Sequence, residues 1–90
     1  MKITKRIKVI GKVQGVFYRK STQKKAKELG LVGWVKNDED GSVLAEIEGN
    51  REDVQRLEAW MKKGPDDAIV DDFLEEEIEE RGYSEFKIVK

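Results

Sequence analysis

The first part of the chain alternates apolar and polar side chains. Ile7, Val9 and Val13 are apolar, and the positions between them include two lysines. This period of two predicts a β-strand over residues 5–13 with one buried face. Gly15 follows, and because glycine adopts backbone conformations that other residues avoid, it permits a tight turn at this point.

A helix and a hairpin are predicted next. Residues 21–29 are rich in helix-forming types, and Gly30 is the residue type that commonly closes a helix. Residues 31–36 are rich in Val and Trp, and residues 42–48 place three apolar side chains on one face. Because the turn-forming residues 37–41 lie between these two segments, we predict a β-hairpin.

A second helix is predicted between Asn50, a good N-cap residue, and the breakers Gly64 and Pro65. Its apolar stripe consists of Val54, Leu57, Trp60 and Met61. After Ile69 the pattern is ambiguous, because Phe73, Leu74 and Ile78 have helical spacing. Other apolar residues of this segment favour strands: Ile69, Val70, Phe86 and Ile88.

The predicted order is strand, helix, hairpin, helix and strand. This order is typical of an α+β fold of the ferredoxin-like type (βαββαβ), in which two helices pack on one face of an antiparallel sheet. A chain of 90 residues suits one compact domain, so we expect a single domain over residues 1–90.

Composition narrows the chemistry. With 18 Lys and Arg against 19 Asp and Glu, the net charge of -1 gives no general attraction to nucleic acid or to an anionic membrane. Cysteine and histidine are absent, which excludes disulfides, zinc sites built on these residues, and any Cys or His nucleophile or base. No stretch approaches the ~20 apolar residues of a membrane span. We therefore expect a cytoplasmic protein that binds neither nucleic acid nor membrane.

Two other interpretations are weaker. Aromatic residues could stack on RNA bases, but aromatics in a small domain are usually core residues, and no RNP-type run is present. The acidic runs at residues 66–67, 71–72 and 75–77 could suggest a metal site, but they lack the EF-hand pattern and are expected to face water. We therefore predict no metal and no cofactor.

Residues 13–19 run from a strand end through a glycine turn to a helix start. Backbone N–H groups at a helix start lack intrahelical partners, and with the positive end of the helix dipole they bind phosphate. A guanidinium adds a bidentate contact. The predicted phosphate cradle is the backbone of Gly15, Val16, Phe17, Tyr18 and Arg19, with the Arg19 side chain beside it.

Asn37 opens the predicted hairpin turn, where its amide could hold a water molecule. In a ferredoxin-like topology we expect the outer strand of the hairpin to lie beside the first strand, which would make Asn37 a neighbour of the Gly15 turn. Taken singly, Gly15 is more often a structural turn and Arg19 a solvated helix residue. Lys12, Lys20 and Lys36 either flank the pocket or are ordinary surface charges.

The chain resembles the acylphosphatase family in two motifs. Residues 11–19, GKVQGVFYR, match a G-x-V-Q-G-V motif followed by aromatic positions and arginine. Residues 33–49, GWVKNDEDGSVLAEIEG, match a segment with glycine, an aromatic, an aliphatic, a basic residue and asparagine that ends in spaced glycines. Residues 63–65 and 86–88 also resemble the family, so the likeness covers essentially the whole chain. It favours strand over helix after Ile69.

The resemblance implies an enzyme that hydrolyses small acyl phosphates to a carboxylate and inorganic phosphate, with phosphate as product and competitor, and acts as a monomer. Arg19 and the N–H groups of residues 15–19 would bind phosphate, and Asn37 would position the attacking water. Asp38 departs from the neutral residue that many relatives carry, and its charge would oppose substrate approach. The alternative is a ferredoxin-like module that binds phosphate or another anion without turnover.

This reaction suits a chain without histidine. The leaving carboxylate has a conjugate acid with a pKa near ~4, so it needs no proton at neutral pH. Phosphoryl transfer is catalysed mostly by positioning and by stabilising charge on the equatorial oxygens. An amide cannot accept the proton of water at neutral pH, so Asn37 is expected to orient the nucleophile. The presence of both Arg19 and Asn37 favours the enzyme over the binding module.

Overall fold

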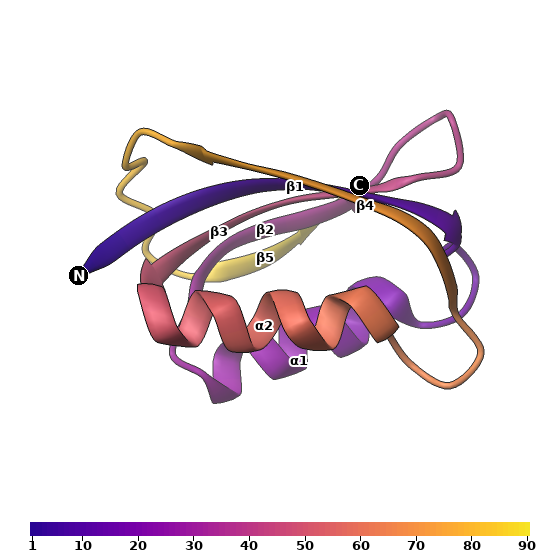
Figure 1. The fold of residues 1–90 in the computed structure, drawn as a ribbon, viewed down its shortest axis with the longest axis horizontal. Helices are drawn as coiled ribbons and strands as arrows, with labels where there is room; N and C mark the ends of the chain where they lie inside the picture. Colours follow the sequence, from indigo (N-terminus) through magenta and orange to yellow (C-terminus); the bar gives the residue numbers. More distant parts are fainter.

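The structure is a computed structural model that describes all residues from 1 to 90. Its elements are β1 (Lys2–Lys12), α1 (Tyr18–Glu28), β2 (Val32–Asn37), β3 (Val43–Asn50), α2 (Arg51–Lys63), β4 (Ile69–Ile78) and β5 (Phe86–Val89). The strands form one sheet in the order β4-β1-β3-β2-β5, and both helices lie along the same face of it (Figure 1). The predicted α+β ferredoxin-like fold is therefore confirmed.

The segment that the sequence pattern left ambiguous forms strands. β4 pairs antiparallel with β1 at one edge of the sheet, whereas β5 pairs parallel with β2 at the other edge. β5 is thus a fifth strand that the βαββαβ prediction did not include, and it is the one strand whose pairing is parallel. The remaining pairings, β1 with β3 and β2 with β3, are antiparallel as expected.

The predicted apolar faces form the core between the sheet and the helices. In β1, Ile7 and Val9 are fully buried, and so are most of the predicted apolar positions of β3 and α2, whereas Trp60 of the predicted α2 stripe is only partly buried. These side chains belong to one cluster of 16 buried hydrophobic residues. Neither helix has the length and the apolar character that crossing a lipid bilayer requires.

α1 begins at Tyr18, three residues before the predicted start. The Tyr18 ring is buried, and its hydroxyl donates a 2.7 Å hydrogen bond to the Met61 carbonyl oxygen in α2. Thr22 in turn donates to the Tyr18 carbonyl oxygen at 2.7 Å. Because these contacts fix the first turn of α1 against α2, the helix starts directly after the glycine turn.

The connection between β4 and β5 is held by a carboxylate on the face of the sheet that the helices leave open. Glu48 is fully buried and accepts hydrogen bonds from the backbone N–H groups of Arg81, Gly82 and Tyr83 and from the Thr4 hydroxyl. Burial opposes the ionisation of Glu48, but these hydrogen bonds outweigh it and lower its pKa to about 2. The bonds fix the start of β5, the strand that carries Ile88.

Candidate active site

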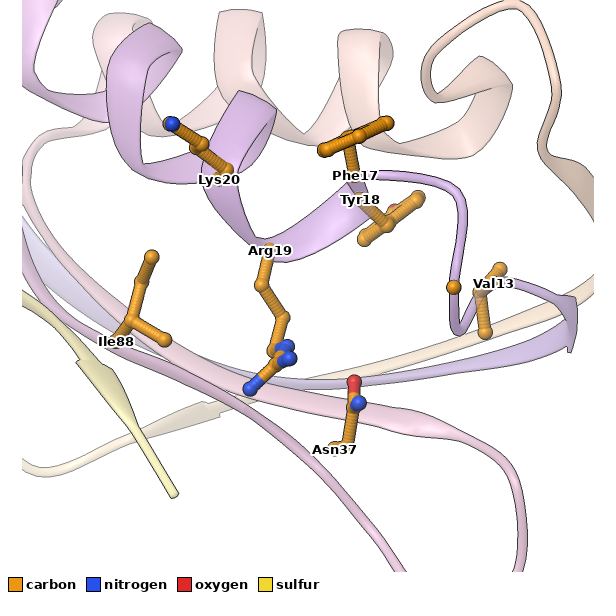
Figure 2. A pocket seen from close by; sticks show the side chains of 8 residues that line it. Val13, Phe17, Tyr18, Arg19, Lys20, Asn37 and Ile88 are labelled. Atoms are coloured by element: carbon orange, nitrogen blue, oxygen red, sulfur yellow. The ribbon is translucent and has the colours of Figure 1, made fainter.

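A cavity of about 350 Å³ lies where β1 leads into α1 and where β2 ends. Figure 2 shows the Arg19 side chain extending from α1 and the Asn37 side chain extending from β2, so that the two point toward one another. The residues that line the cavity are Val13, Gly15, Phe17, Tyr18, Arg19, Lys20, Asn37 and Ile88. The structure thus brings together the two side chains that sequence analysis singled out.

The route that brings them together differs from the predicted one. The hairpin strand beside β1 is β3, so β2 and its terminal Asn37 lie one strand further from β1. α1 packs over β2 and β5, and this packing brings the first turn of the helix close to Asn37. The neighbourhood of Asn37 and the Gly15 turn therefore depends on the position of the helix as well as on strand pairing.

We call residues 15–19 the cradle turn. Gly15 has φ 73°, and Phe17, the N-cap residue of α1, has φ 61°, so two residues of this turn adopt the left-handed conformation. Alternation of right-handed and left-handed residues makes successive N–H groups converge into an anion-binding concavity. The first backbone bond of α1 is donated by Ser21 to the Phe17 carbonyl oxygen, so no N–H group of the cradle turn has a partner in the protein.

The N-terminus of α1 differs from that of α2. In α2 the Asn50 side chain accepts a 3.1 Å hydrogen bond from the Glu52 N–H, and Glu52 and Asp53 place negative charge in the first turn. α1 has neither a side-chain cap nor an acidic residue in its first turn, and it carries Arg19 there instead. Since a helix start is stabilised by negative charge, the first turn of α1 has the electrostatics of a site for an external anion.

Arg19 is the one arginine of five that makes no ion pair. The others pair with Glu or Asp side chains, Arg6 with Glu46 at 2.9 Å for example. Arg19 is half-buried and lines the cavity, so its guanidinium keeps all its donors available for a ligand. A guanidinium in this state matches the geometry of a phosphoryl group, which it can bind through two parallel hydrogen bonds.

Asn37 is the last residue of β2 and is half-buried. Its Oδ1 atom is buried and has no hydrogen-bond partner in the protein, one of only two buried side-chain polar atoms in this state. Leaving a buried acceptor unpaired costs roughly 1 to 3 kcal/mol, so such atoms are uncommon in folded proteins. An amide group that lines a cavity and lacks a partner is suited to bind a small polar ligand such as water.

Gln14 connects the cradle turn to the turn that follows Asn37. Its side-chain amide donates hydrogen bonds of 2.9 Å to the carbonyl oxygens of Asp38 and Ser42, on either side of the turn that follows Asn37. Sequence analysis matched Gln14 to a family motif without assigning it a role. Its position immediately before Gly15 could have indicated a role in the site. The carbonyl groups to which it donates are known only from the three-dimensional structure.

The other residues predicted for the site differ in their contacts with the cavity. Val16 is buried in the core, so only its backbone can serve the cradle turn. Tyr18 lines the cavity, yet its hydroxyl is occupied by Met61, and burial raises its pKa. Of the three lysines, Lys20 lines the cavity, whereas the Lys36 ammonium lies 5.6 Å from the centre of the Trp34 ring.

Apolar side chains form part of the cavity that sequence analysis did not foresee. Val13 belongs to the buried core, whereas Ile88 of β5 is 37% exposed and Phe17 is 76% exposed. Ile88 could not be assigned to the site from sequence because the parallel pairing of β5 with β2 was not predicted. Phe17 was predicted as a backbone donor and, like the other aromatics, as a core residue, and its exposure shows that the second expectation was wrong.

Comparison with known proteins identifies one family. The family model described as Acylphosphatase matches residues 5–88. The chain is 44% identical over 89 residues to "Acylphosphatase" of Methanothrix thermoacetophila, with 99% of each chain covered. It is 49% identical over 70 residues to "Acylphosphatase" of Marinobacter nauticus, covering 78% of this chain and 76% of the relative. The solved structure of an acylphosphatase from Coxiella burnetii superimposes with a TM-score of 0.94 at 42% identity, covering 98% of this chain and 93% of that one.

Proposed function

Since this chain belongs to the acylphosphatase family and hydrolyses acyl phosphates, we propose that the cradle turn and Arg19 hold the phosphoryl group and that Asn37 orients the attacking water. The enzyme is an acyl-phosphate phosphohydrolase whose substrate is a small-molecule acyl phosphate and whose products are a carboxylate and inorganic phosphate.

The proposed phosphoryl site uses donors that the protein leaves free. The N–H groups of residues 15–19 have no internal partner, and Arg19 has no carboxylate partner. Both can therefore bind the equatorial oxygens without first breaking an interaction of the folded protein. Such preorganised donors stabilise the charge that develops in the transition state and need no reorganisation during the reaction.

The proposed role of Asn37 follows from its chemistry and its position. A neutral amide cannot act as a base at neutral pH, but its oxygen accepts a hydrogen bond from water and its N–H₂ group donates one. Asn37 and Arg19 point toward one another in the cavity (Figure 2). In the proposed mechanism, a water held by the Asn37 amide approaches the phosphorus atom of a phosphoryl group held by Arg19. Orientation of this kind contributes part of the ~7 to 11 kcal/mol that ideal proximity provides.

The reaction balances without a catalytic acid. Water forms a bond to phosphorus, the bond between phosphorus and the acyl oxygen breaks, and the carboxylate leaves with the electron pair of that bond. The conjugate acid of the carboxylate has a pKa near ~4, so this group needs no proton at neutral pH. In the proposed mechanism the proton of the attacking water passes to an oxygen of the phosphoryl group, which leaves as inorganic phosphate.

One observation carries the proposal: Asn37 Oδ1 and the Arg19 guanidinium have no partner in the protein, and both residues line one cavity together with most of the cradle turn, whose N–H groups are also free. We infer that the enzyme acts as a monomer, because one chain is enough to supply all the residues of the proposed site. A fold without cysteine needs no oxidising compartment, which supports a cytoplasmic location. The alternative of an anion-binding module without turnover is not favoured, because the matched family and relatives are acylphosphatases.

The test measures the hydrolysis of acetyl phosphate by the parent, by Arg19→Ala and by Asn37→Ala, with inorganic phosphate as competitive inhibitor. Arg19→Ala is expected to lower kcat/KM by a factor corresponding to roughly 3 to 4 kcal/mol and to weaken phosphate binding. Asn37→Ala is expected to lower kcat strongly and to leave the phosphate inhibition constant within about threefold of the parent. Ordinary turnover by Arg19→Ala, or equal losses of kcat and phosphate affinity in Asn37→Ala, would contradict the assigned roles.

A further inference from the structure

A shallow groove of about 510 Å³ runs along α1 from the mouth of the cavity. Its lining residues are Phe17, Lys20, Ser21, Gln23, Lys24 and Lys27. Phe17 and Lys20 line both this groove and the cavity, so the two are continuous. An acyl phosphate whose phosphoryl group lies in the cradle turn can therefore extend its acyl group over Phe17 into the groove.

Phe17 combines two unfavourable features. It adopts φ 61°, a conformation that costs a residue with a side chain roughly 1 kcal/mol or more, and its aromatic ring is 76% exposed. Burial of the ring against the core does not compensate the strain, because the ring makes little contact with the core. The conformation instead places a flat apolar surface at the junction of the cavity and the groove, where a ligand can cover it.

The lysines of the groove are not neutralised by the protein. Lys20, Lys24 and Lys27 follow the i, i+4, i+7 spacing of one helix face, and none of them makes an ion pair. On β1, by contrast, Lys5 pairs with Glu75 at 2.9 Å and Lys8 with Asp40 at 2.8 Å. The single acidic residue of α1 is Glu28, at its last position.

This contrast belongs to a wider separation of charge along the chain. Residues 1–37 contain eleven Lys and Arg and one Glu, whereas residues 38–90 contain seven Lys and Arg and eighteen Asp and Glu. Four of the five β1 cations form ion pairs with these carboxylates, whereas no lysine of α1 forms an ion pair, so α1 keeps its positive charge. The net charge of the protein conceals this local basic surface beside the active site.

We propose that the preferred substrates are acyl phosphates whose acyl group carries a second anionic group, with the acyl chain lying over Phe17 and the anion bound by Lys24 and Lys27. This inference rests on the proposed function, because the cradle turn must hold the phosphoryl group first. Lys24 lies five residues after Arg19 on α1, about 7.5 Å along the helix axis, a separation that a dicarboxylic acyl group and a flexible lysine side chain can span together. A monocarboxylic acyl group such as acetyl is too short to reach these lysines.

The test compares succinyl phosphate, which adds a carboxylate, with acetyl phosphate as the short reference. For the double variant Lys24→Gln/Lys27→Gln, the ratio of kcat/KM for succinyl phosphate to that for acetyl phosphate is expected to fall about fivefold, as for the loss of two exposed ion pairs. This preference should also weaken as salt is added. Lys25→Gln is the matched control, since Lys25 lies on the same helix outside the groove and makes no ion pair.

Phe17 is tested with Phe17→Asn, because asparagine tolerates the left-handed conformation better than most residues do. Its kcat/KM ratio for benzoyl phosphate over acetyl phosphate should fall at least threefold. An unchanged ratio in the double lysine variant, with its turnover of acetyl phosphate intact and still dependent on Arg19, would overturn the anion subsite alone, and an unchanged benzoyl-to-acetyl ratio in Phe17→Asn would overturn the contact of the acyl group with Phe17. Loss of the Arg19 dependence would instead overturn the proposed function.

Discussion

The side-chain amide of Gln14 donates a hydrogen bond of 2.9 Å to the carbonyl oxygen of Asp38, the residue that follows Asn37. This contact links the start of the cradle turn to the strand end that carries the proposed water-orienting amide. We expect Gln14→Ala to lower kcat about tenfold, because Asn37 is then held less firmly, and to change the phosphate inhibition constant less than threefold. Steady-state kinetics with acetyl phosphate and phosphate inhibition measure both quantities.

A purely stabilising role for Gln14 would give another result. In that case Gln14→Ala would lower the melting temperature while kcat at 25 °C stayed at the parent value. Thermal unfolding of the same variant therefore accompanies the kinetics, and the positioning role requires the loss of kcat at temperatures where the variant is fully folded.

Asp38 itself is expected to have a small effect. Its carboxylate does not line the cavity, and its Oδ1 atom accepts a 2.9 Å hydrogen bond from the Glu39 N–H. We expect Asp38→Asn to raise kcat/KM for acetyl phosphate by less than about threefold at low ionic strength, because a half-exposed charge that does not line the cavity repels an anion only weakly. A tenfold increase would show that the Asp38 carboxylate comes much closer to the substrate than this structure places it.

The free energy of unfolding is expected to decrease at acidic pH because of Glu48. Its pKa in the folded protein, about 2, lies below its ordinary value of 4.5, so its contribution to stability is present above pH 4.5 and is lost as the pH falls toward 2. We expect Glu48→Gln to lower the free energy of unfolding by roughly 2 to 3 kcal/mol at pH 7. Urea denaturation at pH 7 and pH 2.5 should show the difference shrinking in acid, and a constant difference would exclude this linkage.

Glu58 is expected to act in the opposite direction. Burial and the neighbouring Glu75 carboxylate raise its pKa from 4.5 to about 7, against the opposing charges of Lys5 and Lys62. A raised pKa in the folded state means that stability is fully present below pH 4.5 and falls as the pH rises through 7. Glu58→Gln should therefore gain roughly 1 to 3 kcal/mol over the parent between pH 5 and pH 8.5.

The control for Glu58→Gln is a substitution of a glutamate that is not buried. Glu79 is exposed and makes no ion pair, so the stability of Glu79→Gln should follow the parent over the same pH range. Urea unfolding of the parent, Glu58→Gln and Glu79→Gln over this pH range measures the three free energies of unfolding. Parallel pH profiles for Glu58→Gln and the parent would show that Glu58 does not titrate in this range.

The sequence predicted those features that depend on local pattern. The alternation around Ile7 and Val9 determines which face of β1 is buried, and the glycine turn before Arg19 indicates the proposed phosphate site on local grounds. The hairpin turn suggested Asn37 as a residue that could hold water, and the family resemblance gave it the role of positioning the attacking water. These residues could be identified because each follows from its neighbours in the chain or from a motif of the family.

Features that depend on tertiary packing could not be predicted in this way. The start of α1 at Tyr18 depends on a hydrogen bond to Met61 in another helix, and the position of Ile88 depends on a parallel strand pairing at the sheet edge. The basic groove was also missed, because total charge does not show that cations of β1 are neutralised while those of α1 are not. Each of these facts concerns residues far apart in the chain.

The uncapped start of α1 also has a consequence for stability under the proposed mechanism. Phosphate released by the reaction would bind the same free N–H groups and the same guanidinium as the phosphoryl group, and it would stabilise the folded state by an amount that grows with the logarithm of its concentration. Fast turnover then requires weak binding of phosphate. A higher affinity for phosphate would raise the melting temperature of the enzyme in phosphate but would slow the release of product.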